Sequence, residues 1–207
     1  LGDRLNIDLP SESKGLIPTV AYYDRVVGKK AWKYSNFKSV SIGQGEVLMT
    51  PLQMANLAAL IANRGYFYRP HVIQPIVDTL KKYETGIDTS LFRPVIDGMQ
   101  WVVEAGTARR ALTKGITICG KTGTVENNKG KDHSVFIAFA PRDNPKIAIA
   151  CIVENAGNYG GTWAAPISSL MIEKYLNGKI SDYSRRWKEP RLLEADFINK
   201  VTEDEEK

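Results

Sequence analysis

The sequence predicts an α+β fold in which three antiparallel strands follow one another along the chain and helices pack against them. Two observations carry this prediction. Residues 116–125, 133–140 and 146–153 are rich in apolar and β-branched residues, and turn-forming residues separate them. Residues 50–65 and 88–104 instead place apolar residues at helical spacing. Because short turns join the strands, we expect them to pair in an antiparallel sheet.

Composition sets the class of protein. The 207 residues suffice for one domain or a large part of one, and an apolar fraction of 43% supports a buried core. The net charge of +5 favours an anionic partner, although an ordinary solvated surface explains it equally well. Basic residues are scattered and do not alternate with aromatics, so we expect no binding to nucleic acid.

The ends of the chain suggest a piece of a longer protein. The chain begins Leu-Gly-Asp-Arg, with neither a methionine nor an export signal, and no apolar run approaches the length of a membrane span. We therefore expect a fragment that neither crosses a membrane nor directs its own export.

Residues 1–40 are predicted to be mostly loop with short helical turns, because prolines and glycines interrupt them. Two Ser-x-x-Lys sequences occur here, from Ser11 to Lys14 and from Ser35 to Lys38. This spacing serves nucleophilic catalysis on a helix, where the amine can deprotonate a hydroxyl one turn away. The first sequence lies between a proline and a glycine, and the second precedes a strand-like stretch at 40–42. We expect neither serine to be a nucleophile.

Residues 50–65 form the clearest predicted helix. Thr50 is a good N-cap, Pro51 suits the first helical position, and Gln53 completes a capping box. Its expected core residues are Met54, Leu57, Ala58 and Ile61. Residues 66–77 are predicted to be extended, with two prolines keeping them at a sheet edge.

Two further helices are expected. Residues 88–104 would bury one apolar face, made of Leu91, Val95, Met99, Val102 and Val103. A short helix or turn at 108–113 then leads to the first strand. Residues 162–176 would form a helix capped by Thr162, with an inward face of Ile167, Leu170, Met171 and Tyr175. A glycine-rich loop at 155–161 precedes it and could flank a cleft.

The sequence contains few of the residues that commonly bind metals or act in redox chemistry, with two cysteines and two histidines. Cys119 and Cys151 fall in different predicted strands without C-x-x-C spacing, and His71 and His133 are too isolated for a zinc site. We expect no metal and no cofactor. A disulfide is conceivable in an exported protein, but we expect both cysteines to act as small buried hydrophobes.

The chemically most informative stretch is residues 116–125. Gly120 and Gly123 flank Lys121 and Thr122, and Thr124 follows. A glycine within a strand marks a place where another group approaches the backbone closely. An ammonium group and two hydroxyls on such a strand suit an extended ligand whose carboxylate they bind, while the ligand backbone adds itself as a further strand.

Two other interpretations of this stretch stay open. Residues 115–122 also match the phosphate-loop pattern G-x-x-x-x-G-K-[ST]. That loop requires a tight turn followed by a helix, whereas 116–118 are stiff residues that favour extended backbone and 123–130 read as a turn. The stretch could also be a purely structural strand. The carboxylate-binding strand edge is the favoured interpretation.

The Lys-Thr-Gly triplet is one of three short elements of penicillin-recognising serine enzymes. Other segments occur in the order and spacing of class B penicillin-binding proteins, at 41–56, 62–65, 120–124 and 133–141. The chain therefore resembles the C-terminal part of the transpeptidase domain of that family, and 7–18 most resembles its elongation type, penicillin-binding protein 2. The resemblance implies an incomplete β-lactamase/transpeptidase-like domain over residues 1–180, followed by a charged extension over 181–207.

The resemblance implies a function for the parent protein. Such enzymes are peptidoglycan D,D-transpeptidases, which cross-link stem peptides through a serine acyl-enzyme and bind β-lactam antibiotics. Lys121 would support the proton network and attract the substrate carboxylate, which Thr122 and Thr124 would hydrogen-bond. Gly123 would give the ligand room, and the backbone N–H of Thr124 would be one of two oxyanion donors. Lys121 and Thr124 are thus the expected catalytic residues.

The resemblance also implies what this chain lacks. The family's nucleophile belongs upstream of both Ser-x-x-Lys sequences, and no Ser-x-Asn occurs. We expect the chain alone to be inactive. The parent would lie on the periplasmic face of the bacterial inner membrane, held by an N-terminal anchor outside this chain, with cell-wall elongation proteins as partners.

Missing upstream strands would expose the edge of 146–153 and invite self-association. A β-lactam sensor or β-lactamase of the same superfamily, and a non-enzymatic interaction module, remain alternatives.

Overall fold

The computed structural model describes residues 1–73, 81–157 and 159–196, and the chain divides into two units. One unit contains residues 1–53 and 68–82, and the other contains 54–67 and the chain from 83 onward. Of the extended segment predicted at 66–77, Tyr66–Tyr68 forms strand β1, which pairs with β2 (Lys82–Glu84), whereas residues 69–73 form no strand. Residues 74–77 of that segment lie outside the described residues, as does the acidic end of the charged extension.

The first unit is organised around Tyr23, which is only 1% exposed. It contains two short helices, α1 (Val20–Val26) and α2 (Tyr34–Val40). The Phe37 ring lies 5.4 Å from the Tyr23 ring and 5.2 Å from the Trp32 ring, and the Tyr23 hydroxyl donates to Glu46 at 3.1 Å. Helices of this length are unstable alone, so this aromatic cluster holds them.

The structure corrects one expectation about the Ser-x-x-Lys sequences. Ser11 and Lys14 lie in irregular backbone as predicted, but Ser35 and Lys38 lie on α2 and do not precede a strand. Asn36 caps the start of this helix by accepting the N–H of the N-cap residue at 2.8 Å. Both Ser35 and Lys38 are exposed, and no hydrogen bond joins them within the described part of the chain. Helical geometry alone therefore does not activate this serine.

The predicted capping box is present at the start of α3 (Pro51–Ala62). The N–H of Thr50 donates to Gln53 Oε1 at 3.0 Å, and the N–H of Gln53 donates to Thr50 Oγ1 at 3.2 Å. Of the expected core residues, Ala58 is fully buried, whereas the other three are half-buried: Met54, Leu57 and Ile61.

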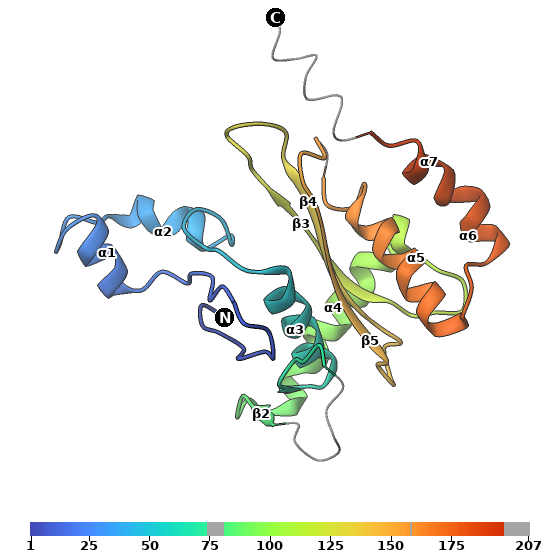
Figure 1. Ribbon diagram of the computed structural model, residues 1–207, viewed down its shortest axis with the longest axis horizontal. Helices are drawn as coiled ribbons and strands as arrows, with labels where there is room; N and C mark the ends of the chain where they lie inside the picture. The colour runs from blue at the N-terminus through green and yellow to red at the C-terminus, as the bar shows by residue number, and fades with distance from the viewer. Residues whose placement is uncertain (74–80, 158, 197–207) are drawn as a thin grey trace, which may run out of the picture. The chain divides into compact units, whose positions relative to one another are not determined.

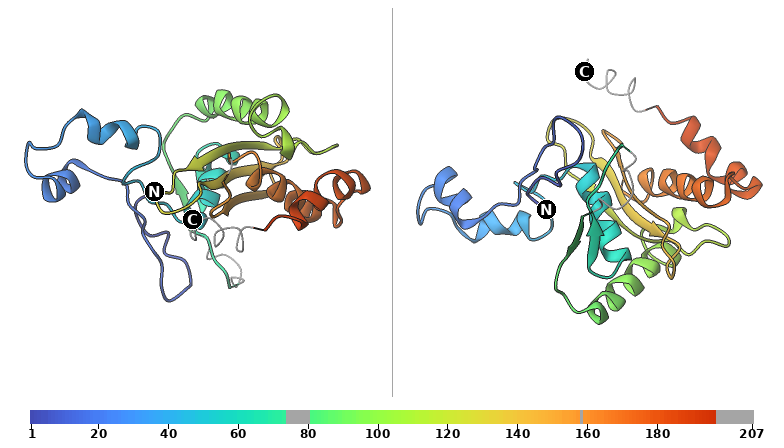
Figure 2. Two further views of the ribbon diagram at one scale, coloured as in Figure 1. Left: turned by 90° about the horizontal axis from the view of Figure 1, so that it is seen from above. Right: turned by 60° about the horizontal axis from the view of Figure 1, so that its bottom comes forward.

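The second unit contains the predicted sheet. Its strands are β3 (Cys119–Val125), β4 (His133–Ala140) and β5 (Ile147–Val153), antiparallel and in the order β3-β4-β5. β3 begins later than predicted because Ile116 forms an isolated bridge with Thr113. Two helices, α4 (Phe92–Glu104) and α5 (Ala164–Asn177), cover opposite faces of the sheet (Figures 1 and 2). The smaller elements are η1 (Thr89–Leu91), η2 (Arg109–Ala111), α6 (Asp182–Trp187) and α7 (Glu189–Leu193).

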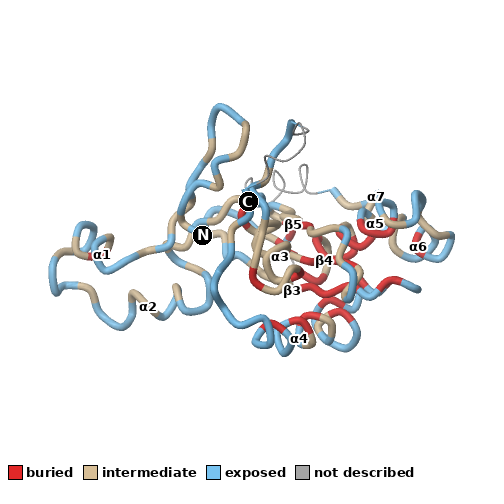
Figure 3. The backbone as a smooth tube through the Cα atoms, turned by 90° about the horizontal axis from the view of Figure 1, so that it is seen from below, coloured by how far each residue is buried: buried red, intermediate tan, exposed pale blue. Residues whose placement is uncertain are grey.

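The core of this unit lies on both faces of β4 (Figure 3). Phe136 packs with Ala164 and Ile172 of α5, whereas Phe139 packs with Phe92 and Met99 of α4. Side chains alternate along a strand, so residues at even and odd positions enter different clusters. β4 is therefore the central strand of the sheet. Its sequence is continuously apolar because both of its faces are buried.

The predicted inward faces of both long helices need correction. α4 buries Phe92, Ile96, Met99 and Val103, while Leu91 and Val95 are exposed. Met99 and Val103 are buried as predicted, but Phe92 and Ile96 take the places expected for Leu91 and Val95, because η1 takes up the start of the predicted helix. The Phe92 ring packs close to Gly65.

Of the four side chains predicted to face inward from α5, Met171 is 54% and Tyr175 64% exposed, and Ile167 and Leu170 are only half-buried. Thr162 does not cap this helix, since the N-cap position is Trp163, without a side-chain bond. The buried face consists mainly of small residues: Ala164, Ala165, Pro166, Ser168, Ser169, Ile172 and Glu173. Small residues let the helix approach the sheet closely, which leaves no room for Met or Tyr at the contact.

Both cysteines are free, Cys119 fully buried in β3 and Cys151 half-buried in β5. β4 lies between these strands, so two interstrand spacings separate the thiols, more than a disulfide can span. Burial raises the pKa of Cys119 to about 12 and also raises the pKa of Cys151, so both remain protonated at neutral pH.

Lys188 anchors α6 and α7 to the rest of the second unit. Its Nζ donates to Ser169 Oγ at 2.9 Å and to Thr113 Oγ1 at 3.0 Å. Burial lowers the pKa of Lys188 to about 8, although the charge of Glu173 acts in the opposite direction. The beginning of the charged extension is therefore packed structure up to α7.

The lowered pKa of Lys188 makes stability depend on pH. Because the folded state binds the lysine proton more weakly than the unfolded state, stability should rise as pH increases from about 8 to about 10.5. Compared with Lys188→Met, the wild-type chain should gain about 1–2 kcal/mol of unfolding free energy between about pH 7.5 and pH 10. Urea titrations at both pH values measure this, and a pH-independent difference between the two proteins would contradict it.

Gly120 should tolerate no side chain. A Cβ there would lie 2.3 Å from Cζ of Phe136, whereas a Cβ at Gly123 would lie 3.5 Å from Val135, an ordinary contact. We expect Gly120→Ala to lower the unfolding free energy by about 1–3 kcal/mol. The matched control Gly123→Ala should change it by less than about 1 kcal/mol. Equal losses of unfolding free energy in the two variants, measured by urea unfolding, would contradict this prediction. They would show that the Phe136 ring can move away from the added methyl group.

Candidate functional site

Residues 121–124 lie in the middle of β3, as the strand-edge interpretation requires. Within the described sheet β3 pairs only with β4, where Lys121 lies opposite Ile137 and Thr124 opposite Ser134. β3 is therefore an edge strand (Figure 1). No helix begins directly after Thr122, because the strand continues to Val125. Lys121 therefore does not lie at a helix N-terminus, which is where a phosphate loop needs its lysine.

The polar side chains of β3 point to two different faces. Alternation along the strand places Lys121 and Gly123 on the face of Cys119, and Thr122 and Thr124 on the opposite face, which carries α5. A ligand lying on one face would meet only half of the predicted set. The strand edge is the one approach that reaches both faces.

Lys121 carries an uncompensated positive charge. Its side chain is exposed, and Nζ donates to the carbonyl oxygen of Thr122 at 2.7 Å. Among the described residues, no carboxylate forms an ion pair with this ammonium group. A carbonyl oxygen satisfies one of its three hydrogens and leaves the charge available to an anionic ligand.

Thr122 has a partner that the sequence did not reveal. Its Oγ1 lies 2.7 Å from Oγ1 of Thr107, which follows α4. No local pattern in the sequence links Thr107 to β3. The pair shares one hydrogen bond, so one of its two hydroxyl hydrogens can still be donated to a ligand.

The glycine-rich loop before α5 lies directly against β3. The N–H of Gly160 donates to Thr124 Oγ1 at 3.3 Å. A Cβ at Gly160 would lie 2.2 Å from the carbonyl oxygen of Gly123, and one at Gly161 would lie 1.9 Å from that of Thr107. Two adjacent glycines were the sequence signal for this close approach.

Ser134 holds this loop in place from β4. It is fully buried, its Oγ donates to the carbonyl oxygen of Gly160 at 3.1 Å, and it accepts the N–H of Ala164 at 3.1 Å. The hydroxyl thus uses its donor and an acceptor position at once. Ser134 is a positioning residue that the sequence did not single out.

The described residues contain no group of three or more His, Cys, Asp or Glu side chains that could hold a metal ion. His133 has a structural contact, because its Nδ1 accepts the N–H of Asn155 at 3.0 Å. A search of the described helices for one long and apolar enough to cross a membrane finds none.

Comparison with known proteins places this geometry in a family. The family profile described as "Penicillin binding protein transpeptidase domain" matches residues 1–173. The peptidoglycan D,D-transpeptidase MrdA of Acinetobacter baumannii is 34% identical over 200 residues, which cover 84% of this chain and 29% of that protein.

Two solved structures extend the comparison. One is a complex between penicillin-binding protein 2 (PBP2) and MreC from Helicobacter pylori, with a TM-score of 0.71 and 27% identity over 84% of this chain and 34% of that one. The other is an imipenem acyl-enzyme complex of penicillin-binding protein A from M. tuberculosis, with a TM-score of 0.59 and 32% identity over 67% of this chain and 33% of that one.

The chain spans about a third of the length of these relatives. The profile match and the identity over most of the chain nevertheless agree with the strand order and with the segments recognised in the sequence. The chain belongs to the penicillin-binding protein transpeptidase domain family, and relatives of the PBP2 type are among those it matches.

Proposed function

We propose that this chain is the C-terminal part of a peptidoglycan D,D-transpeptidase and supplies the substrate-binding strand of its active site. The observation that carries the proposal is the uncompensated ammonium group of Lys121 on the edge strand β3. The names of the relatives support the reaction, and the imipenem acyl-enzyme of one relative supports the binding of β-lactams.

The proposed substrate is a peptidoglycan stem peptide that ends in a carboxylate. Its backbone pairs with the edge of β3 that β4 leaves unpaired, and Gly123 gives the ligand room because it carries no side chain. Lys121 attracts the carboxylate from one face of the strand. Thr122 and Thr124 reach it from the other and contribute hydroxyl groups.

The proposed chemistry needs a serine outside these residues. That serine attacks the carbonyl carbon of the penultimate D-alanine, an ester forms, and the terminal D-alanine leaves as the free amino acid. An amine of a neighbouring stem peptide then attacks the ester, forms the cross-linking amide and releases the serine. Lys121 supports the proton transfers, and the backbone N–H of Thr124 stabilises the oxyanion, a contribution on the order of 3 kcal/mol in comparable sites.

The remaining proposals concern the whole protein. In this chain, residues 1–180 belong to the transpeptidase domain and residues 181–207 form an extension of it. It works at the extracytoplasmic face of the inner membrane, held there by a segment outside this chain, together with cell-wall elongation proteins. The complex of a PBP2 relative with MreC supports partners of that kind.

Substitution of Lys121 tests the proposed site in the longer protein that includes the upstream part of the domain. Lys121→Ala should slow acylation by a fluorescent penicillin on the order of a hundredfold, because the carboxylate loses its charged partner. Lys129→Ala, in the exposed β3–β4 turn, changes net charge equally and should leave the rate within about twofold. Equal rates for both variants would refute the role of Lys121.

The 207-residue chain alone should form no covalent adduct with the same penicillin, because it lacks the nucleophile. Stoichiometric labelling of this chain would contradict the proposal. Rapid hydrolysis of the penicillin by the longer protein, with no lasting adduct, would instead favour the β-lactamase alternative.

We also propose that the isolated chain self-associates through β5. Within the described sheet β5 pairs only with β4, so its second edge presents unpaired backbone groups. Light scattering should show dimers or larger species at micromolar concentration, and β5 amides should exchange slowly. A monomer with freely exchanging β5 amides would contradict this.

A further inference from the structure

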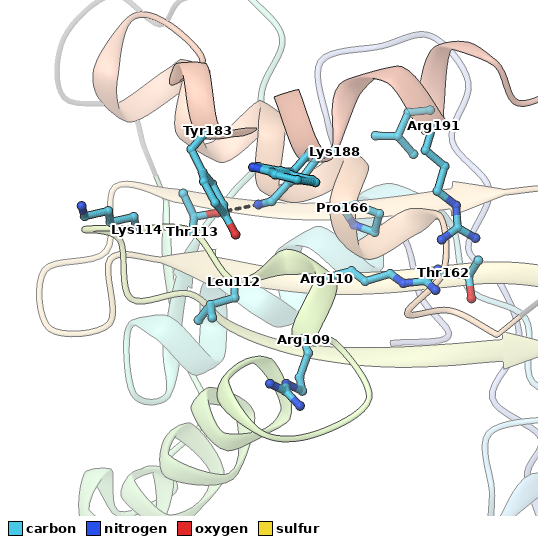
Figure 4. A pocket seen from close by; sticks show the side chains of 12 residues that line it. Arg109, Arg110, Leu112, Thr113, Lys114, Thr162, Pro166, Tyr183, Lys188 and Arg191 are labelled. Atoms are coloured by element: carbon cyan, nitrogen blue, oxygen red, sulfur yellow. Dashed lines mark hydrogen bonds between the residues drawn. The ribbon is translucent and has the colours of Figure 1, made fainter. Parts of the chain in front are cut away.

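A basic cavity lies in the second unit, bounded by η2, the start of α5, and the helices α6 and α7 (Figure 4). Its volume is about 770 Å³, within the range of small-molecule sites. Five of its lining residues are cationic: Arg109, Arg110, Lys114, Lys188 and Arg191. None of the described residues that line it carries a carboxylate.

Two of these cations face each other. Arg110 from η2 and Arg191 from α7 extend toward the same region, beside the Thr162 side chain (Figure 4). Partial burial and then the charge of Arg191 lower the pKa of Arg110, so the guanidinium groups lie close enough to repel. Arg110 has no hydrogen-bond or ion-pair partner among the described residues. An anion between the two groups would remove this repulsion.

Arg191 is preorganised for such a ligand. Its guanidinium carbon lies 4.9 Å from the centre of the Trp163 ring, a cation–π contact that restricts the side chain. A guanidinium held in one orientation loses less freedom when it binds an oxyanion in a bidentate manner. The Thr162 hydroxyl adds a donor at the same point.

Lys188 supplies a further positive charge but no activated nucleophile. The hydroxyls it contacts donate their own hydrogens elsewhere, Ser169 to the carbonyl of Pro166 at 2.8 Å and Thr113 to that of Ala111 at 3.0 Å. Neither hydroxyl can pass its proton to the lysine without losing a bond in the interior. The arrangement of Lys188 and Ser169 is therefore structural and not catalytic.

The α5 N-terminus assists without being the site itself. Its first N–H groups already have acceptors, since Ala164 donates to Ser134 and Ala165 to the carbonyl of Gly160. A ligand near Thr162 would still experience the positive end of the helix dipole. The specific contacts must come from the arginines.

The remaining walls are apolar. Tyr183 and Trp187 of α6 line the cavity, together with Leu112 and Pro166. An inorganic ion would leave this surface without a contact, whereas an aromatic or aliphatic group would cover it. We propose that this cavity binds an organic oxyanion, a phosphate or carboxylate between Arg110 and Arg191 that carries an apolar group against Tyr183 and Trp187. This inference does not rest on the function proposed for β3.

Calorimetric titration of the 207-residue chain tests the site with phenyl phosphate, phenylacetate and inorganic phosphate as probes. At least one of the two aromatic anions should bind saturably, and whichever binds more tightly identifies the preferred acid group. Phenyl phosphate should bind at least about threefold more tightly than inorganic phosphate, because the ring adds buried apolar area.

Three variants locate the binding. Arg110→Gln and Arg191→Gln should each weaken it about tenfold or more. Arg93→Gln, which removes the same charge from an exposed residue of α4 outside the cavity, should weaken it less than about twofold. Circular dichroism without ligand should show that all three variants keep the fold.

Two results would overturn the inference. One is the absence of saturable binding of either aromatic anion at millimolar concentration. The other is an equal loss of affinity in Arg93→Gln and the cavity variants, which would show that net charge alone attracts the probes. Equal affinity for phenyl phosphate and inorganic phosphate would refute the contact with Tyr183 and Trp187.

Discussion

The burial of β4 on both faces is the constraint on which the second unit depends. Phe136 and Phe139 point to opposite sides of the strand, so each anchors one helix layer, α5 or α4. Gly120 makes this possible at the adjoining strand, because any side chain there would occupy the space of the Phe136 ring. The register that follows places Lys121 in the middle of an edge strand, with its ammonium group exposed. The site is thus a consequence of how the core packs.

The loop before α5 packs against β3 and against the turn that follows α4. Gly160 lies against the backbone of Gly123, and Gly161 lies against the turn that contains Thr107. Buried Ser134 fixes the loop by bonding Gly160 and the first N–H of α5. Thr107 in turn reaches Thr122. β3 is therefore supported by contacts from two segments that are distant in the sequence. Such support restricts the motion of a strand that binds a ligand.

The same two segments also border the basic cavity. Arg110 follows Thr107 in the η2 turn, and Thr162 follows Gly161 in the loop. β3 and the basic cavity are therefore bordered by the same two backbone segments. Cations are present at both places, and neither Lys121 nor Arg110 has a carboxylate partner among the described residues.

The sequence by itself determined much of this protein. Apolar runs and their turns predicted the three strands and their antiparallel order, because alternation and turn chemistry are local properties. The capping box at Thr50 and Gln53 was predicted for the same reason. Stiff residues before Gly120 correctly favoured a strand over a phosphate loop.

Only the tertiary structure decided which faces are buried and which distant residues meet. α5 presents mainly alanines and serines to the sheet and leaves Met171 exposed. The helix packs so closely against the sheet that the size of a side chain, as well as its polarity, decides whether it can be buried there. Thr107 meets Thr122, and Arg110 and Arg191 come to line one cavity, through packing that no local spacing encodes. Local patterns specify elements, whereas contacts between elements depend on how the whole core fills its volume.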